Sequence, residues 1–206
     1  MHSLVALSLL ESMREIDLPS EDDPVEYENE VGARRLGANK TIADQIERYR
    51  ALVNKDGTVS DEEILSIMRL CGRRPDSGLV FSEAGRWAAA LAVEGTSRRV
   101  RVGLKVLPGG LRDGLGWSVT RRLALNVFGI VLLQENGHAT AHPSGSSFGA
   151  EATADGSACE FFGSGVAALL RAFTDFEGAV THDECVARND PRCVWRTHLA
   201  SQGQGE

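Results

Sequence analysis

The chain has 206 residues, of which 42% are apolar and 25% charged, a composition typical of a globular protein that can bury its own core. A formal net charge of −7 argues against a broad nucleic-acid-binding surface, which is usually basic. No stretch reaches the about 18 apolar residues that could span a bilayer. Neither a nucleic acid nor a membrane is therefore expected as a partner.

The start of the chain bears on its location. The apolar residues 4–10 are followed at once by Glu11, without the basic start and small-residue cleavage site of a signal peptide. A cytoplasmic location is expected. In that compartment the four cysteines are expected to be thiols or metal ligands rather than disulfides.

Residues 1–75 are predicted to form a helical extension. Apolar residues recur at helical spacing over residues 3–16 and 41–53, and Ser60 with Glu63 forms a capping box for a third helix. The first two helices each present an apolar stripe that must be buried. A second copy of the chain would bury it, so a homodimer is predicted. The alternative is that these helices fold back over the same chain as a lid.

The segment NKDGTVSDEE resembles the second half of a calcium-binding EF-hand loop. With Gly57 at the sixth position of such a loop, Leu52 falls at the first, where a carboxylate is needed. A capped turn between two helices is the better interpretation.

Residues 76–200 are predicted to form a second, mixed domain, followed by a disordered tail at 201–206. A helix is expected over 79–93 and a helix leading into a strand over 117–128. The Gly-rich stretch 96–116 is weakly patterned, and its basic residues are interpreted as a solvated surface.

The last third of the chain combines hairpins with one helix. Asn136-Gly137 follows an apolar run and favours a β-hairpin, and a loop is expected over 144–156. A helix is expected over 158–173, and strands over 178–187 and 192–199 are joined by a tight turn. These patterns predict an α+β fold.

Four residues in this part have the chemistry of a metal site. Cys185 and Cys193 flank the hairpin turn, His182 precedes Cys185 by three residues, and Cys159 lies at the start of the preceding helix. Thiolate and imidazole are the ligands that zinc prefers in closed sites. If the helix packs on the hairpin, the four side chains converge. The alternative is that the cysteines simply pack in a core.

The fourth ligand is the least certain from the pattern. In an ideal strand His182 and Cys185 point to opposite faces, so a bulge or a twist is required. Asp183 and Glu184 are the alternatives to His182.

The same segments resemble the 4-vinyl reductase domain. In that family a helix that opens with Cys leads into a strand reading roughly E-x-x-C-x-A-x-G-D-P-x-C-x-F, and here ACEFFGSGVAALLRAF leads into HDECVARNDPRCVW. The upstream SEAGRWAAALA resembles the family's first helix, which carries a Gly-Arg pair. The resemblance covers residues 79–199, and it is specific at the C-terminal motif and loose between 96 and 150.

The resemblance implies a structural zinc. In the sensor domains of phenol- and xylene-responsive activators of this family, zinc is bound by the helix Cys, a strand Glu and two hairpin Cys. By position these ligands fall on Cys159, His182, Cys185 and Cys193, with His in place of the usual Glu. Both residue types bind zinc, so the substitution preserves the site. The family's sensor domains also dimerise through an N-terminal segment.

The resemblance further implies an antiparallel sheet with helices packed on one face, as in vesicle-tethering TRAPP subunits, and an apolar ligand buried between helices and sheet. His138 and His142 share a strand face and are predicted either to anchor a phenolic hydroxyl or a metal-bearing ring, or to be exposed. The candidate pocket residues are Trp87, Trp117, Phe128, His138, His142, Phe148, Phe161, Phe162 and Trp195.

No catalytic residue is predicted, because the sequence has no phosphate-binding loop, nucleophile elbow or paired carboxylates before a catalytic His. The first hypothesis is a sensor or carrier of an apolar, aromatic or tetrapyrrole-like ligand. The second is an enzyme or accessory in tetrapyrrole vinyl reduction. The third is an assembly adaptor like the TRAPP subunits, which binds a partner protein.

Overall fold

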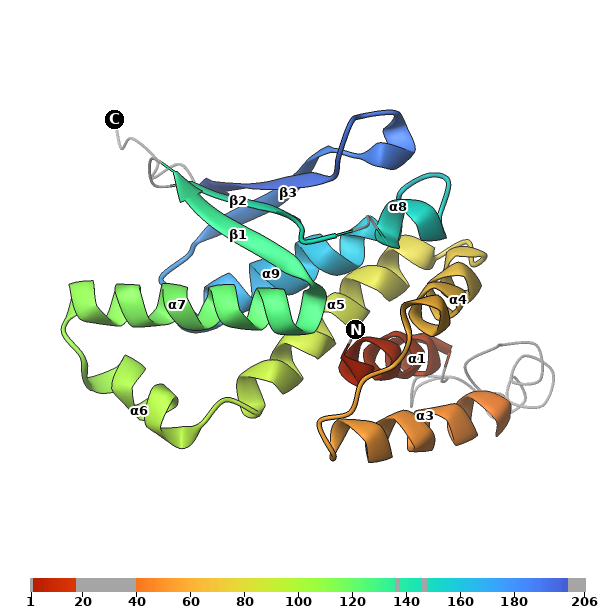
Figure 1. Cartoon of the computed structure of the whole chain (residues 1–206), viewed down its shortest axis with the longest axis horizontal. Helices are drawn as coiled ribbons and strands as arrows, with labels where there is room; N and C mark the ends of the chain where they lie inside the picture. Colours follow the sequence, from red (N-terminus) through yellow and green to blue (C-terminus); the bar gives the residue numbers. More distant parts are fainter. Residues whose placement is uncertain (1, 18–39, 136–137, 146–147, 200–206) are drawn as a thin grey trace, which may run out of the picture.

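The computed structural model describes residues 2–17, 40–135, 138–145 and 148–199 (Figure 1). It confirms the α+β class. The helices are α1 Ser3–Asp17, α3 Lys40–Val53, α4 Asp61–Gly72, α5 Ser77–Glu94, α6 Arg98–Val106, α7 Gly109–Phe128, α8 Phe148–Ala152 and α9 Cys159–Phe173. The strands are β1 Ile130–Glu135, β2 His138–Pro143, β3 Gly178–Glu184 and β4 Val194–Leu199, with the 3-10 helix η4 Val186–Arg188 between the last two.

The strands form one antiparallel sheet in the order β1-β2-β4-β3. The sheet lies along one side of the molecule with α7 and α9 beneath it, and α5 and α1 follow farther from the sheet (Figure 1). Helices therefore pack on one face, as predicted. Gly129 ends α7 in the left-handed conformation, with a φ of 65°, and turns the chain directly into β1.

The centre of the helical layer is the crossing of α5 with α9. A Cβ on Gly85 would lie 2.2 Å from the carbonyl oxygen of Phe161, so only glycine permits this approach. Gly85 belongs to the Gly-Arg pair on which the family resemblance partly rests, and its place in the structure has a packing reason.

Helix α1 is buried on almost all sides within its own chain. Val5, Leu9 and Met13 are fully buried among α5, α3 and α4, and one hydrophobic core contains residues from both sides of position 75. The apolar stripe of α1 is thus already covered and is not a free surface for a second copy. The homodimer stays a prediction, and so does the domain boundary at residue 75.

The sequence pattern was misleading in the stretch 96–116, which forms α6 and the first turns of α7. Ser97 accepts a hydrogen bond from the amide of Val100 and caps α6. Gly116 of α7 is required by packing on α9, since a Cβ there would lie 1.9 Å from the carbonyl oxygen of Phe173, whereas Gly109, Gly110 and Gly114 have nothing within 4 Å of a Cβ. Tertiary contact overrides the low helix propensity of glycine here.

Two further differences are local. The predicted loop 144–156 contains α8, and the predicted strand 178–187 ends at Glu184. The Asn136-Gly137 turn and the tail 201–206 lie outside the described residues. In the described part of the chain, no helix has the length and apolar character needed to cross a bilayer.

Of the predicted capping box, the N-cap is confirmed, since the amide of Glu63 donates to Ser60 Oγ at 3.2 Å. The side chain of Glu63 accepts a hydrogen bond from Tyr49 and pairs with Arg48. Burial and the hydrogen bond to Glu63 raise the pKa of Tyr49. This network joins α3 to α4, as expected for a structural turn rather than a calcium loop.

Candidate metal centre and neighbouring hollows

The four predicted metal ligands come together between α9 and the β3–β4 hairpin. Cys159 is the first residue of α9, His182 lies in β3, Cys185 follows β3 and Cys193 precedes β4. Their ligand atoms all lie within 4.8 Å of one another, so the cluster could hold a metal ion. The predicted convergence of helix and hairpin is confirmed.

The hairpin loop is held in shape by its own hydrogen bonds. Cys185 donates its amide to Asp190 Oδ2 at 2.7 Å, and the Arg188 guanidinium donates to the carbonyl of His182 at 2.8 Å. Asn189 takes the left-handed conformation with a φ of 68°, which asparagine tolerates better than most residues. The pairing of β3 with β4 shifts register between His182 and Glu184, which supplies the predicted bulge.

The sulfurs are sealed from solvent. Cys159, Cys185 and Cys193 are each 1% exposed, and all four cysteines, which lie in the described ranges, are free thiols. The hydrogen bond with Cys193, then burial, and then the charges of the neighbouring sulfurs raise the pKa of Cys159. Without a cation Cys159 therefore favours the protonated thiol. A bound cation would reverse this preference and release protons.

One ring nitrogen of His182 has no hydrogen-bond partner in the described structure. Its ring stacks on Trp195 with the centroids 4.8 Å apart and the planes 14° apart. Its Nε2 is buried and has no hydrogen-bond partner among the described residues. Leaving such a buried polar atom unsatisfied costs about 1–3 kcal/mol, and a metal ion at the cluster would remove that cost.

The two alternative ligands point elsewhere. Asp183 and Glu184 each bind Arg196 at 2.9 Å, and Glu184 also pairs with Arg192 at 3.3 Å. The Arg196 and Thr181 hydrogen bonds lower the pKa of Asp183 against the opposing effect of burial. The geometry therefore selects His182 as the fourth donor.

Two glycines that sequence reasoning missed close the site from the other side. A Cβ on Gly149 would lie 2.8 Å from Cys159 Sγ, and one on Gly156 would lie 2.9 Å from Cys185 Sγ. Gly156 also has a φ of 74°, which glycine adopts without strain. The Gly-rich composition of 144–156 was the available signal, but it marks flexible loops as often as close packing.

Several of the predicted pocket residues belong to the core rather than to a cavity. Phe128, Phe161, Phe162 and Trp195 are buried and form a chain of ring contacts with centroids 5.4, 5.3 and 5.9 Å apart. This chain runs from the end of α7 to the stacked His182. Trp87 is partly buried against the same core. Phe148 opens α8, but its side chain lies outside the described part.

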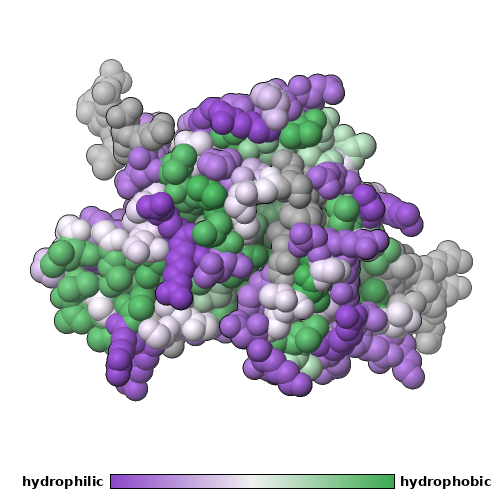
Figure 2. Space-filling model, in the orientation of Figure 1, coloured by the Kyte–Doolittle hydropathy of each residue, from purple (hydrophilic) through white to green (hydrophobic). Residues whose placement is uncertain are grey.

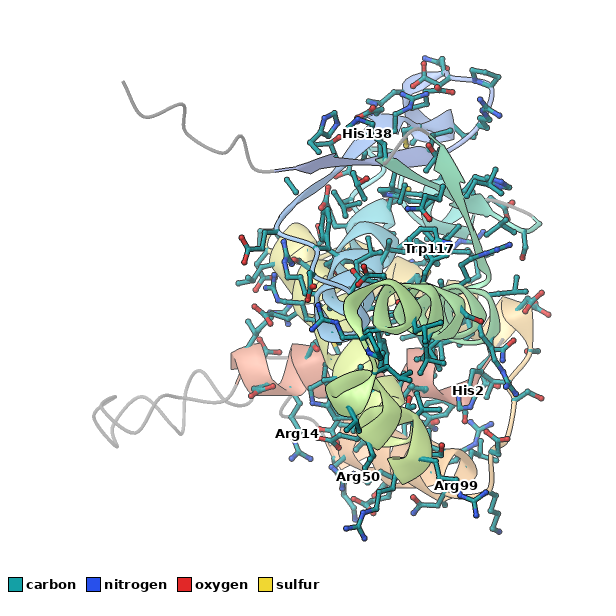
Figure 3. All side chains as sticks on the ribbon, turned by 90° about the vertical axis from the view of Figure 1, so that its left-hand side faces the viewer. His2, Arg14, Arg50, Arg99, Trp117 and His138 are labelled. Carbon is teal, nitrogen blue, oxygen red and sulfur yellow. The ribbon has the colours of Figure 1, made fainter. Side chains whose placement is uncertain are left out.

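His138 and His142 share a strand face, as predicted. Ala139 and Ala141 of the same strand are buried, so the two histidines lie on the opposite face, away from the helices. His138 is exposed, and Figure 3 shows it well apart from Trp117 on α7. The pair does not converge with the other candidate residues.

Trp117 lines a hollow, unlike the buried aromatic residues. A hollow of about 380 Å³ lies between α7, the end of α9 and the sheet, with walls that include Trp117, Leu170, Phe176 and Gln134. Trp117 also borders a second hollow of about 500 Å³ beside Leu125 and Val131. A third, of about 670 Å³, lies among α5, α6, α7 and the end of α9.

Compared with protein-family models, curated proteins and solved structures, the chain has no significant match. The resemblance to the 4-vinyl reductase domain therefore rests on the motifs quoted above and stays a prediction.

Proposed function

We propose that this protein is a non-catalytic sensor or carrier of a small apolar or aromatic molecule, with a fold held together by one structural zinc ion. The observation that carries the proposal is the closed set of three cysteine sulfurs and one imidazole, with His182 Nε2 buried and unsatisfied in the described structure. Zinc is the divalent metal that this donor set favours in four-coordinate sites.

A structural role follows from the number and burial of the donors. A catalytic zinc keeps one coordination position for water or substrate, whereas here the chain supplies four donors. The bound ion would add a link between α9 and the β3–β4 hairpin, and its binding energy would add to folding stability.

The hollow at Trp117 supports the choice of ligand. It lies between helices and sheet, where the 4-vinyl reductase resemblance implies an apolar ligand, and Trp117, Phe176 and Leu170 give it an apolar side. Its volume of about 380 Å³ is near the lower end for small-molecule sites. A single aromatic ring fits this volume better than a tetrapyrrole does. We therefore rank tetrapyrrole vinyl reduction second among the three hypotheses. The adaptor hypothesis ranks third.

The zinc is tested by elemental analysis of the purified full chain, which should give one zinc per chain. His182→Ala should weaken zinc binding by about 10- to 100-fold, and His182→Glu should restore most of it. Asp183→Ala is the matched control and should retain the metal. A metal-free protein with an unchanged melting temperature after chelator treatment would refute the proposal.

The ligand is tested by calorimetric titration with phenol and 4-methylphenol. Trp117→Ala should abolish binding, whereas Trp87→Ala removes a tryptophan that does not line the hollow and should leave binding intact. Equal effects of the two substitutions would contradict the assigned hollow. A visible absorbance band in the purified protein would instead favour the tetrapyrrole hypothesis.

A further inference from the structure

The corner formed by α6 and the start of α7 is built unlike the rest of the molecule. Helix α6 has no buried residue in its described part. Large apolar side chains are exposed around it, with Val106 at 73% and Leu111 at 64%. Figure 2 shows this apolar area at the left of the molecule, interrupted by hydrophilic side chains. Such an area on one helix corner indicates contact with something outside the described fold.

Beside this area lies the cleft of about 670 Å³. Its apolar walls are Val93, Val102, Leu104 and Phe173, contributed by the ends of α5 and α9 and by α6. Phe173 is far from the other three in the sequence, and no sequence pattern marked the four as a group. The cleft does not include Trp117, although Thr174 and Asp175 border both hollows.

The charged lining of the cleft is predominantly positive. Arg98, Arg112 and Arg171 contribute three guanidinium groups against the single carboxylate of Asp175. The whole chain has a net charge of −7, so this cleft stands out against an acidic background. A cleft lined by one sign of charge concentrates ions of the other sign.

Two of the three guanidinium groups are held in place. Arg112 is ion-paired with Asp175, and Arg171 donates to the carbonyl of Gly178 at 2.8 Å while lying over the ring of Phe176. Arg98, in the first turn of α6, is exposed. A partly fixed cationic rim over apolar walls matches a ligand with an anionic head and an apolar body.

The carbonyls at the C-terminal end of α9 also face this region and would repel an anion. The Leu170 carbonyl, however, accepts hydrogen bonds from the Thr174 amide at 2.9 Å and from Thr174 Oγ1 at 2.6 Å. This carbonyl is therefore already satisfied within the chain.

We propose that this cleft binds an amphipathic anion, a carboxylate or phosphate attached to an alkyl or acyl chain. The head group contacts Arg98 and Arg171, and the chain lies along Val102, Leu104 and Phe173. The same chemistry is available from a free acyl carboxylate and from the head group of an anionic lipid. This site is separate from the aromatic site at Trp117 and does not depend on it.

The test is calorimetric titration of the full-length protein with decanoate and decyl phosphate, using decanol and decyltrimethylammonium as matched probes. Both anions should bind at least about tenfold more tightly than decanol, and the cation should not bind, because the head group is recognised by charge. Added salt should weaken anion binding. Equal affinities for decanoate and decanol would overturn the proposal.

Substitutions locate the site. Arg98→Gln should weaken decanoate binding by about three- to tenfold without affecting folding, since the residue is exposed. Arg99→Gln is the control, because Arg99 is exposed on the same helix turn and does not line the cleft. Val102→Glu, which adds a carboxylate to the wall, should abolish binding. A loss with Arg99→Gln equal to that with Arg98→Gln would refute the assignment.

Co-sedimentation with vesicles separates the two sources of the anion. Binding of decanoate without binding to phosphatidylcholine vesicles that contain phosphatidic acid identifies a free ligand. Binding to those vesicles, but not to pure phosphatidylcholine, with the same loss in Arg98→Gln, identifies a lipid head group. Failure to bind either probe overturns the proposal. Trp117→Ala should leave both affinities unchanged.

Discussion

The metal centre and the α6–α7 corner differ in nearly every physical respect. At the metal centre three sulfurs are 1% exposed, and Gly149 and Gly156 leave no room for even a methyl group beside two of them. At the corner Val106 is 73% exposed and α6 buries no described residue. In the first region, closely packed neighbouring atoms fix the position of the cysteine side chains. The second has the surface of a site that is completed from outside, so substitutions should cost much stability in the first region and little in the second.

The largest effect is expected at the metal centre. Cys193→Ser removes a buried sulfur donor from the cluster and should eliminate zinc binding. We expect a loss of stability of at least about 4 kcal/mol, because the binding energy of a structural metal is folding energy. Chemical denaturation with parallel metal analysis measures both.

The matched control is Cys71→Ser, the same change at a buried cysteine outside the cluster. Burial raises the pKa of the Cys71 thiol to about 12, so it is a neutral core side chain. This variant should lose some stability and keep its full zinc content. Loss of zinc in Cys71→Ser would undermine the assignment of the cluster.

The next largest effect is expected where α1 is anchored. Arg74 binds both carboxylate oxygens of Asp17 at 2.7 Å and also binds Asp76, and the Asp17 side chain is only 4% exposed. Arg74→Ala removes the bidentate guanidinium from this buried carboxylate and should cost about 3 kcal/mol, measured by denaturant unfolding.

Acid provides an independent check of the same anchor. The hydrogen bonds from Arg74 lower the pKa of Asp76, so this interaction stabilises the fold above the unfolded carboxyl pKa of about 3.9. Its contribution disappears as the pH falls through that value towards the lower folded pKa. The stability difference between wild type and Arg74→Ala should therefore shrink below about pH 4. A difference that grows on acidification would contradict this reading.

A smaller loss is expected at the crossing of α5 and α9. The added methyl of Gly85→Ala would meet the carbonyl oxygen of Phe161 and Ser164 Oγ, both 2.2 Å away. The helices must separate, at a cost of about 2 kcal/mol. Gly78→Ala is the control on the same helix, because nothing lies within 4 Å of its Cβ. It should be neutral or slightly stabilising in thermal unfolding.

The smallest effect is expected at the corner. Val106→Ala and Leu111→Ala remove exposed side chains and should change stability by less than about 0.5 kcal/mol. Chemical denaturation and thermal unfolding measure the change in stability, as for the variants above. A loss as large as that of Gly85→Ala would show that the corner is packed in solution, and the contrast between the two regions would fail.

Local sequence was sufficient wherever the determining interaction is short in range. The cap of α4 needs only Ser60 and Glu63, and the apolar periodicity of α1 and α9 needs only their own residues. The three thiols of Cys159, Cys185 and Cys193 limit which metals could bind, whatever their arrangement in space. The motif that resembles the 4-vinyl reductase domain also named the four residues of this cluster before their distances were known.

Tertiary structure decided what depends on contacts between distant segments. The bulge in the β3–β4 pairing and the arginine partners of Asp183 and Glu184 select His182 as the fourth donor. At Gly116, α7 packs closely on α9, a contact that no local pattern contains.

Helices α1 and α6 show the same division. The sequence determined that α1 is amphipathic enough to need a partner, and the packing of α5, α3 and α4 around it decided that the partner is its own chain. Helix α6 lies in a stretch that was only weakly patterned in sequence, and its Val102 and Val106 stay exposed in the described structure. Periodicity reports that a face must be buried, but only the positions of the other elements decide whether the chain itself can bury it.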